Sequence, residues 1–363
     1  MKNKIKILIN RFENNLFLDL LVTIFLSHIY YKITFTETVI NDFSLLDQIR
    51  NDYVTTTSFF VESPTFAVLG LLLNFENLDT YKLLIYLVAF ICLVLIVINI
   101  QFLGKYSTLF LFGGWLVTCS WFIGYVDSIS ALIMVLIFKE IFIKEFSISK
   151  ILLLFTILCI NHNGISMAVS IIFLVLVNKK YRIKFSIIIL ISQLLGNIVV
   201  QFYLNYIGFS GRGRFRFIFN DNVIENAVSF LGNNLLAVLW SGFLGSSFLI
   251  LLIANVISWG DMRRVFTAIV IALLFTAIAL DTSRIFSLLV LPIILYSLMK
   301  FKDQVTFENK LSILYSVSLI THFTIGVYFF YGSLTSSSPM GFSESFYDFI
   351  PRIVNSLMSN IWK

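Results

Sequence analysis

Long apolar stretches recur along the whole chain, and they constrain its fold more than any other feature of the sequence. Of the 363 residues, 58% are apolar and 13% are charged, whereas a soluble domain has about 25% charged residues. The mean hydropathy of +0.92 is too high for a soluble core with a wetted surface. We therefore expect an all-α, polytopic membrane helix bundle, formed as a single domain over residues 1–363.

This composition excludes soluble enzymes, disulfide-stapled secreted domains and disordered proteins. The sequence has no P-loop or dinucleotide-binding glycine motif. Its three cysteines, Cys92, Cys119 and Cys159, lie inside apolar runs without CxxC spacing, so we interpret them as packing residues. A basic, polar N-terminus precedes an apolar run without a small-residue cleavage site, which predicts a retained anchor.

Eleven segments are apolar enough to form membrane helices, some of them short. The least certain region is 150–177, which can form one long helix or two short helices broken at 161–164. We favour two, because short broken helices are tolerated where they line an enclosed cavity. The predicted spans are residues 16–35, 81–101, 107–123, 128–143, 150–160, 165–177, 185–207, 235–258, 266–280, 285–299 and 311–331.

The distribution of basic residues predicts the orientation of these spans. With a cytoplasmic N-terminus, 17 of the 26 Lys and Arg residues fall in cytoplasmic segments and 9 elsewhere. This bias favours an odd number of spans and an external C-terminal tail. Three long segments then lie outside, at 36–80, 208–234 and 332–363, and we expect the protein to act at its outer face or within the membrane.

The first outer segment is acidic and contains one predicted helix. Apolar residues recur at helical spacing through Val39, Phe43, Leu46 and Ile49, which indicates a short amphipathic helix at the interface. Its carboxylates either belong to a solvated acidic loop, or one of them faces a cavity as a general base or a metal ligand. The candidates closest to the first span are Glu37, Asp42 and Asp47.

Two further polar residues interrupt the spans. Asp127 begins the fourth span, where a carboxylate caps the free N–H groups of a helix or contacts substrate. His162 lies between the two short helices, where it satisfies broken-helix backbone or takes part in proton transfer. His28 and His322 are single residues in spans, and we interpret them as interhelical hydrogen bonders.

The second outer segment contains alternating arginines, against the positive-inside trend. If the segment is extended, Arg212, Arg214 and Arg216 point to one side and the intervening Phe residues to the other. Three guanidiniums repel one another unless an anion lies among them, and phosphate fits the planar Arg fork. We favour a polyprenyl-phosphate site; the alternative is snorkelling to lipid headgroups. Nucleic acid is excluded by the location.

Asp281 and Arg284 lie in a tight outer turn between two short spans. They either pair locally and cap the following helix, or mark the edge of an active site, with Asp281 in a supporting role. The sequence contains no HExxH string and no cluster of His residues. We therefore expect no cofactor, and a single Mg²⁺ on loop carboxylates stays open.

The whole pattern resembles the integral-membrane O-antigen polymerases of the Wzy type: a Phe- and Ile-rich chain of about eleven spans with arginine-bearing outer loops. That resemblance implies polymerisation of undecaprenyl-linked oligosaccharide repeats at the periplasmic face of a bacterial inner membrane. It also implies contact with membrane lipid and a chain-length regulator as partner. The arginines, with Arg284, would bind lipid phosphate, and Asp42, Asp47, His162 or Asp127 would act in catalysis.

A weaker resemblance is to GT-C glycosyltransferases, which use polyprenyl-phosphate sugars and have an acid shortly after the first helix. Glu37, Asp42 and Asp47 match that placement. The opposing class is a polysaccharide flippase or transporter, which keeps its site near the membrane midplane and often contains internal repeats. The polar residues here gather on one predicted face and no repeat occurs, which favours glycosyl transfer.

Overall fold

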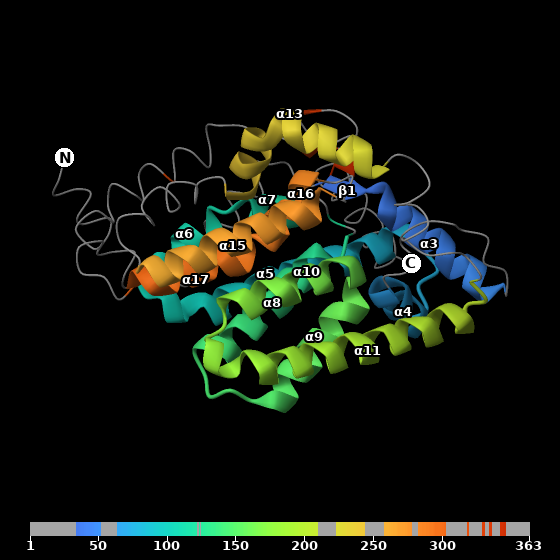
Figure 1. Cartoon of the computed structure of the whole chain (residues 1–363). Helices are drawn as coiled ribbons and strands as arrows, with labels where there is room; N and C mark the ends of the chain where they lie inside the picture. Colours follow the sequence, from blue (N-terminus) through green and yellow to red (C-terminus); the bar gives the residue numbers. More distant parts are fainter. Residues whose placement is uncertain are drawn as a thin grey trace.

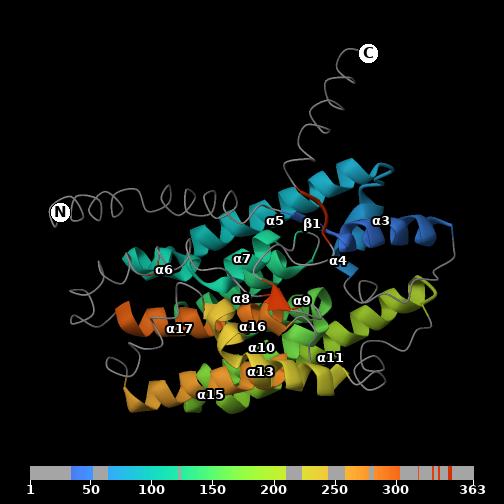
Figure 2. The same cartoon turned by 90° about the horizontal axis from the view of Figure 1, so that it is seen from above.

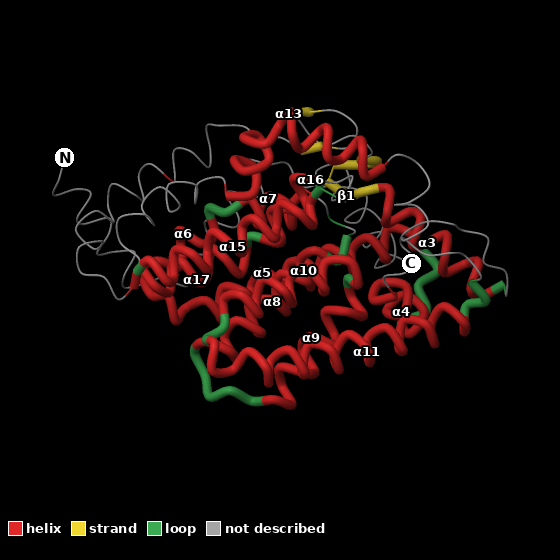
Figure 3. Tube along the Cα trace, viewed as in Figure 1, coloured by secondary structure: helices red, strands yellow, loops and turns green. Residues whose placement is uncertain are grey.

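The apolar segments of this chain fold into helices that pack against one another, as the computed structural model shows (Figure 1). The structure describes residues 34–51, 64–121, 123, 125–209, 223–243, 258–277, 282–302, 318, 329–330, 334–335 and 342–345. Helices dominate these ranges, which confirms the all-α class (Figure 3). Most of the predicted spans 16–35 and 311–331, and most of the tail 332–363, lie outside the described residues.

The first half of the described chain ends in a pair of short helices. The elements are β1 (Thr34–Thr36), α3 (Glu37–Arg50), α4 (Pro64–Leu72), α5 (Leu78–Ile100), η2 (Gln101–Tyr106), α6 (Ser107–Leu111), α7 (Gly114–Trp121), α8 (Asp127–Phe142), α9 (Ile148–Asn161) and α10 (Asn163–Leu176).

The second half begins with the short turn η3 (Lys179–Tyr181), which leads into α11 (Arg182–Tyr206), the longest of the described helices at 25 residues. Its further elements are α13 (Val223–Phe243), α15 (Trp259–Thr276), α16 (Thr282–Leu289), α17 (Leu291–Lys302), β2 (Phe329–Phe330), β3 (Leu334–Thr335) and β4 (Phe342–Ser345). The short strands pair antiparallel, β1 with β4 and β2 with β3.

Three helical stretches in the described ranges are long and apolar enough to cross a membrane. They are Leu78–Leu111, Lys179–Tyr206 and Arg284–Lys302, with mean hydropathies of 3.1, 2.0 and 1.8. The helices α9 and α10 are apolar but shorter. These lengths support a membrane protein, while the number of spans and the sidedness stay predictions.

The choice between one and two helices in 150–177 is decided by contacts across the break. Phe146, just before α9, stacks on Tyr181, just after α10, with ring centroids 5.6 Å apart. Phe155 of α9 also meets Phe173 of α10 edge-on at 5.9 Å. The two helices therefore run antiparallel and turn at His162, and the prediction of two short helices is confirmed.

The amphipathic helix predicted in the first outer segment is confirmed as α3. Val39 and Leu46 are fully buried, and Phe43 and Ile49 pack partly buried on the same cluster. The same segment, 36–80, also contains α4 and the first turn of α5, neither of which was predicted from the sequence. The start at Pro64 fits its preference for the first helical turn.

The predicted continuous span 107–123 is wrong, because the chain breaks at Gly113 between α6 and α7. Glycine is required next to this break: a Cβ on Gly114 would lie 1.8 Å from the carbonyl oxygen of Ser241 in α13. The close approach of the two backbones sets the position of α7. Between α16 and α17 the interruption is limited to Val290, just before Pro292. Val290 still donates to the Phe286 carbonyl at 3.0 Å and accepts from Ile294 at 2.9 Å.

The predicted boundary between outer segment 208–234 and span 235–258 coincides with a kink at Asn234 inside α13 (φ −125°, ψ 22°). Helix α13 already begins at Val223, twelve residues before the predicted span 235–258. Its first three turns mix polar and apolar residues, so a search for continuous apolar runs passes over them. Helix α13 packs against α16 and α7, on the upper side of the assembly in Figure 1.

Candidate functional site

A buried ion pair joins two residues that the sequence marked separately. Nη1 of Arg284, in α16, lies 3.3 Å from Oδ2 of Asp127, the first residue of α8. Their side chains are 7% and 1% exposed. Removing two charges from water is costly, and they persist in an apolar bundle only when they are paired.

Neighbouring groups stabilise the positions of both Asp127 and Arg284. The guanidinium carbon of Arg284 lies 3.9 Å from the centre of the Tyr125 ring, a close cation–π stack. Asp127 lies at the N-terminus of α8, where the helix dipole favours a carboxylate. Ser287, three residues after Arg284, bonds to Thr118 of α7 at 2.5 Å. The position of the arginine on α16 is therefore fixed from two sides.

Asp127 lies inside α8 and does not occupy its N-cap position. The N-cap position of α8 is Val126, which makes no side-chain capping bond. Its carbonyl accepts a hydrogen bond of 3.2 Å from the side-chain amide of Asn161. Asn161 also donates to Ser130 at 2.9 Å and accepts from Thr65 at 2.7 Å, which ties α8, α9 and α4 together.

His162 lies in the turn next to this asparagine. Its backbone N–H donates to Leu158 at 2.8 Å and its carbonyl accepts from Ser166 at 2.9 Å. The side chain is 4% exposed. The link through Asn161 brings His162 to the same end of the helices as Asp127 and Arg284. We call this the Asp127 end.

The acids of α3 are arranged differently. The Asp47 side chain is 55% exposed and lies 3.4 Å from Arg50, one turn later. This is the geometry of a solvated surface acid. Asp42 and Glu37 lie in α3, and their side chains are outside the description. We therefore place more weight on Asp127 than on Asp47 as a functional carboxylate.

Arg212, Arg214, Arg216 and Asp281 lie outside the described residues. The ion-pair partner of Arg284 among the described residues is Asp127, 157 residues away in the sequence. The chain on either side of the arginine segment is described. The end of α11 shares a buried cluster with Val126, and α13 packs on α16.

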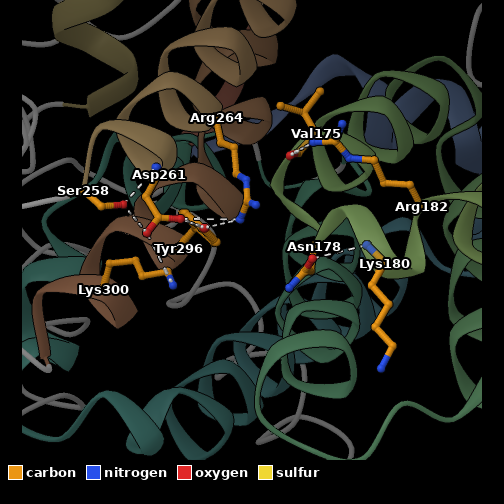
Figure 4. Close-up of polar contacts among 9 residues, drawn as sticks. All are labelled: Val175, Asn178, Lys180, Arg182, Ser258, Asp261, Arg264, Tyr296 and Lys300. Carbon is orange, nitrogen blue, oxygen red and sulfur yellow. Dashed lines mark hydrogen bonds and ion pairs between the residues drawn. The ribbon is translucent and has the colours of Figure 1, made fainter.

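A second polar cluster lies at the far end of the same helices, about 24 Å along α16 and α17 from Arg284. The Asp261 carboxylate accepts from Tyr296 at 2.5 Å and Ser258 at 2.9 Å, and lies 3.5 Å from Arg264 and 3.7 Å from Lys300 (Figure 4). The turn through Asn178, Lys180 and Arg182 lies at this end too (Figure 4). We call it the basic end.

The partners of Asp261, which precedes the predicted span 266–280, stabilise its ionised form. Burial alone would raise its pKa, but bonds from Tyr296 and Ser258 and the charges of Lys300 and Arg264 together hold the pKa below its usual value. Stabilisation from a lowered carboxyl pKa is complete above the unfolded value, about 3.9, and is lost as the pH falls through the folded value.

Asp261→Asn is therefore expected to destabilise the protein at pH 7 by about 1–2 kcal/mol, the usual contribution of such bonds. The difference from the unmodified protein should shrink as the pH falls below about 4. Unfolding can be followed by reaction of the three buried cysteines with a thiol dye. Asp47→Asn is the control, because its exposed ion pair should contribute less than about 1 kcal/mol at any pH. If Asp261→Asn still destabilised the protein at low pH, the stabilising role assigned to the ionised Asp261 carboxylate would be contradicted.

Sequence reasoning missed several residues at the Asp127 end. Tyr125 gave no signal, because a single aromatic residue before a span is common. Asn161 was noted only as a neighbour of His162. Lys82 is 4% exposed although it carries a charge, and its position in an apolar run could have identified it. Across the described ranges, no three His, Cys, Asp or Glu side chains converge as metal ligands.

Comparison with known proteins finds no matching family model, no similar curated protein and no similar solved structure.

Proposed function

We propose that this protein transfers a glycosyl group from a polyprenyl-diphosphate donor, in the manner of an O-antigen polymerase, at its Asp127 end. The observation that carries the proposal is the buried Asp127–Arg284 ion pair in a bundle of apolar helices. Ionisable residues within membrane proteins are costly, and they commonly mark substrate pathways or proton relays. A structural pair of this kind could be replaced by apolar packing without loss.

Arg284 has the chemistry to bind the leaving group. A guanidinium presents five N–H donors in a planar fork that matches phosphate oxygens in pairs. Tyr125 stacks on the face of the guanidinium and so does not occupy the donor edges that lie in the guanidinium plane. When the bond between the anomeric carbon and the phosphate oxygen breaks, its electron pair stays on that oxygen. A fixed positive charge stabilises this developing charge.

Asp127 has the chemistry to accept the proton. The acceptor hydroxyl oxygen forms the new bond to the anomeric carbon, and its proton must pass to a base. If phosphate draws Arg284 toward itself, the Asp127 carboxylate loses its counter-charge and becomes a stronger base. His162 is the second candidate for this role, because it is buried at the same end.

The arginine segment would complete the phosphate site. Arg212, Arg214 and Arg216 follow α11, whose last turns pack in one cluster with Val126, the neighbour of Asp127. The segment leads into α13, which packs on the helix that contains Arg284. This connection supports a role for the three arginines beside Arg284.

The test is a polymer-length assay with purified protein in liposomes and a polyprenyl-diphosphate oligosaccharide as substrate. Arg284→Lys keeps the charge and loses the fork, so we expect activity to fall about 100-fold or more. The control is Arg50→Lys, whose side chain forms an exposed pair with Asp47 and should keep full activity. Full activity of R284K would reject the phosphate role of this residue.

A deletion strain separates the proposed activity from its alternatives. Surface polysaccharide limited to one repeat unit indicates a polymerase. Loss of a single branch sugar indicates a GT-C-like transferase, and loss of all exported polysaccharide indicates a flippase. Either of the last two results would overturn the proposal.

A further inference from the structure

Helix α11 has a carboxamide at every fourth position over half of its length. The residues are Gln193, Asn197, Gln201 and Asn205. Positions four apart lie nearly above one another on a helix, so these side chains form one ridge about 18 Å long. Within Lys179–Tyr206, only 28% of the most apolar 18-residue stretch is buried in the protein. Helix α11 lies along the lower edge of the assembly in Figure 1 and again at its margin in Figure 2.

The inner half of this ridge bonds within the protein. Gln193 accepts from Ser166 at 3.1 Å and donates to Ser170 at 3.3 Å. Asn197 accepts from Asn163 at 2.7 Å, although its own side chain is exposed. These bonds join α11 to α10 and account for two of the four carboxamides.

Hydrogen bonds among the described residues do not account for the two carboxamides in the outer half of the ridge. Gln201 and Asn205 are exposed, and their amides make no hydrogen bond within the part of the chain that the structure describes. The apolar residues beside them are exposed as well: Leu190, Leu194, Ile198 and Phe202 are 63%, 56%, 50% and 71% exposed. A polar ridge and an apolar ridge thus lie next to each other on the outer surface of one helix.

The aromatic and lysine residues at the basic end indicate how deep this ridge lies. Nζ of Lys184 lies 5.5 Å from the centre of the Phe146 ring, and Nζ of Lys180 lies 5.7 Å from that of Tyr181. Such pairs are typical of the headgroup level. About 20 helical residues cross the hydrocarbon, so its outer boundary falls near Leu204. Gln201 then lies below that boundary, where water does not satisfy an exposed amide.

We infer that the carboxamide ridge of α11 is the surface at which a second copy of this chain packs. A carboxamide is both donor and acceptor, so it pairs with another carboxamide. Two copies inserted the same way are related by a two-fold axis along the membrane normal, which puts Gln201 opposite Gln201 of the other copy. Lipid tails offer no hydrogen-bonding group, whereas interhelical amide bonds stabilise helix association in membranes.

The experiment measures association of the full-length protein in liposomes, by energy transfer between two populations labelled with different dyes. Replacing Gln201 and Asn205 with leucine should weaken association about tenfold. The swap Q201N/N205Q keeps both amides and should keep the dimer. The control is Asn233→Leu, the same change at an exposed asparagine of α13.

A cysteine cross-link tests the same geometry by a separate route. The three native cysteines are buried, so a new cysteine is the one accessible thiol. Asn205→Cys should form a disulfide-linked dimer on mild oxidation, and Val199→Cys, about 120° away around the helix, should not. The inference would be overturned if the unmodified protein showed no energy transfer, or if the leucine variant showed as much transfer as the unmodified protein. Equal cross-linking at positions 205 and 199 would overturn it as well.

Discussion

Replacing Arg284 with methionine is expected to lower the free energy of unfolding by about 3–5 kcal/mol, because it leaves Asp127 charged, buried and without its ionic partner. The change would be measured by thermal unfolding in detergent, reported by the buried cysteines. Asp47→Asn is the control, because it leaves the bond from Arg50 to the Phe75 carbonyl in place. The ion pair of Asp47 with Arg50 lies at the surface and should contribute less than about 1 kcal/mol.

The double variant Asp127→Leu with Arg284→Met separates the structural contribution from the proposed chemistry. With both charges gone, neither charge of this ion pair is left buried without the other, so stability should return to within about 1–2 kcal/mol of the unmodified protein. Glycosyl transfer should stay undetectable, since the phosphate fork and the base are both missing. A stable and fully active double variant would show that the pair has no part in catalysis.

The sequence predicted helices where the apolar runs are long and their ends contain polar residues. Helix α8 begins at Asp127, one residue before the predicted span, and α11 covers 182–206 against the predicted 185–207. The break at His162 was predictable, because four consecutive small or polar residues interrupt an apolar stretch. The break at Gly113 was missed, since the contact between α7 and α13 that requires it involves residues over 120 positions apart.

The candidate site was predictable residue by residue but not as a pair. Asp127 and Arg284 each stood out as a charge at the end of an apolar run, and the predicted topology put both on the same side. Their contact depends on how α8 packs relative to α16, which no local pattern encodes. Asp47 had an equally plausible sequence context, and its exposure of 55% became known only from the packing of α3.

The close approach of α7 to α13 at Gly114 provides the second large prediction. Gly114→Ala puts a methyl group 1.8 Å from the carbonyl oxygen of Ser241 and 2.9 Å from that of Gly242. Both are backbone atoms, so no side-chain rotation relieves the clash, and α7 and α13 must move apart. Overpacking usually costs about 1–3 kcal/mol, and we expect a loss of about 3 kcal/mol or more here.

Two further glycines make this prediction a graded test. A methyl group on Gly242 would meet the Phe286 ring at 2.3 Å, and that side chain, although buried, can tilt, so Gly242→Ala should cost less than Gly114→Ala. Gly232 lies in α13 with no atom within 4 Å of an added methyl group, so Gly232→Ala should stabilise by about 0.5–1 kcal/mol. Because α7 and α13 both pack on α16, separation of α7 from α13 also displaces Arg284. The unfolding temperature and the rate of glycosyl transfer should therefore both be lowest in Gly114→Ala, intermediate in Gly242→Ala and highest in Gly232→Ala. A Gly114→Ala protein as stable as Gly232→Ala would contradict this packing.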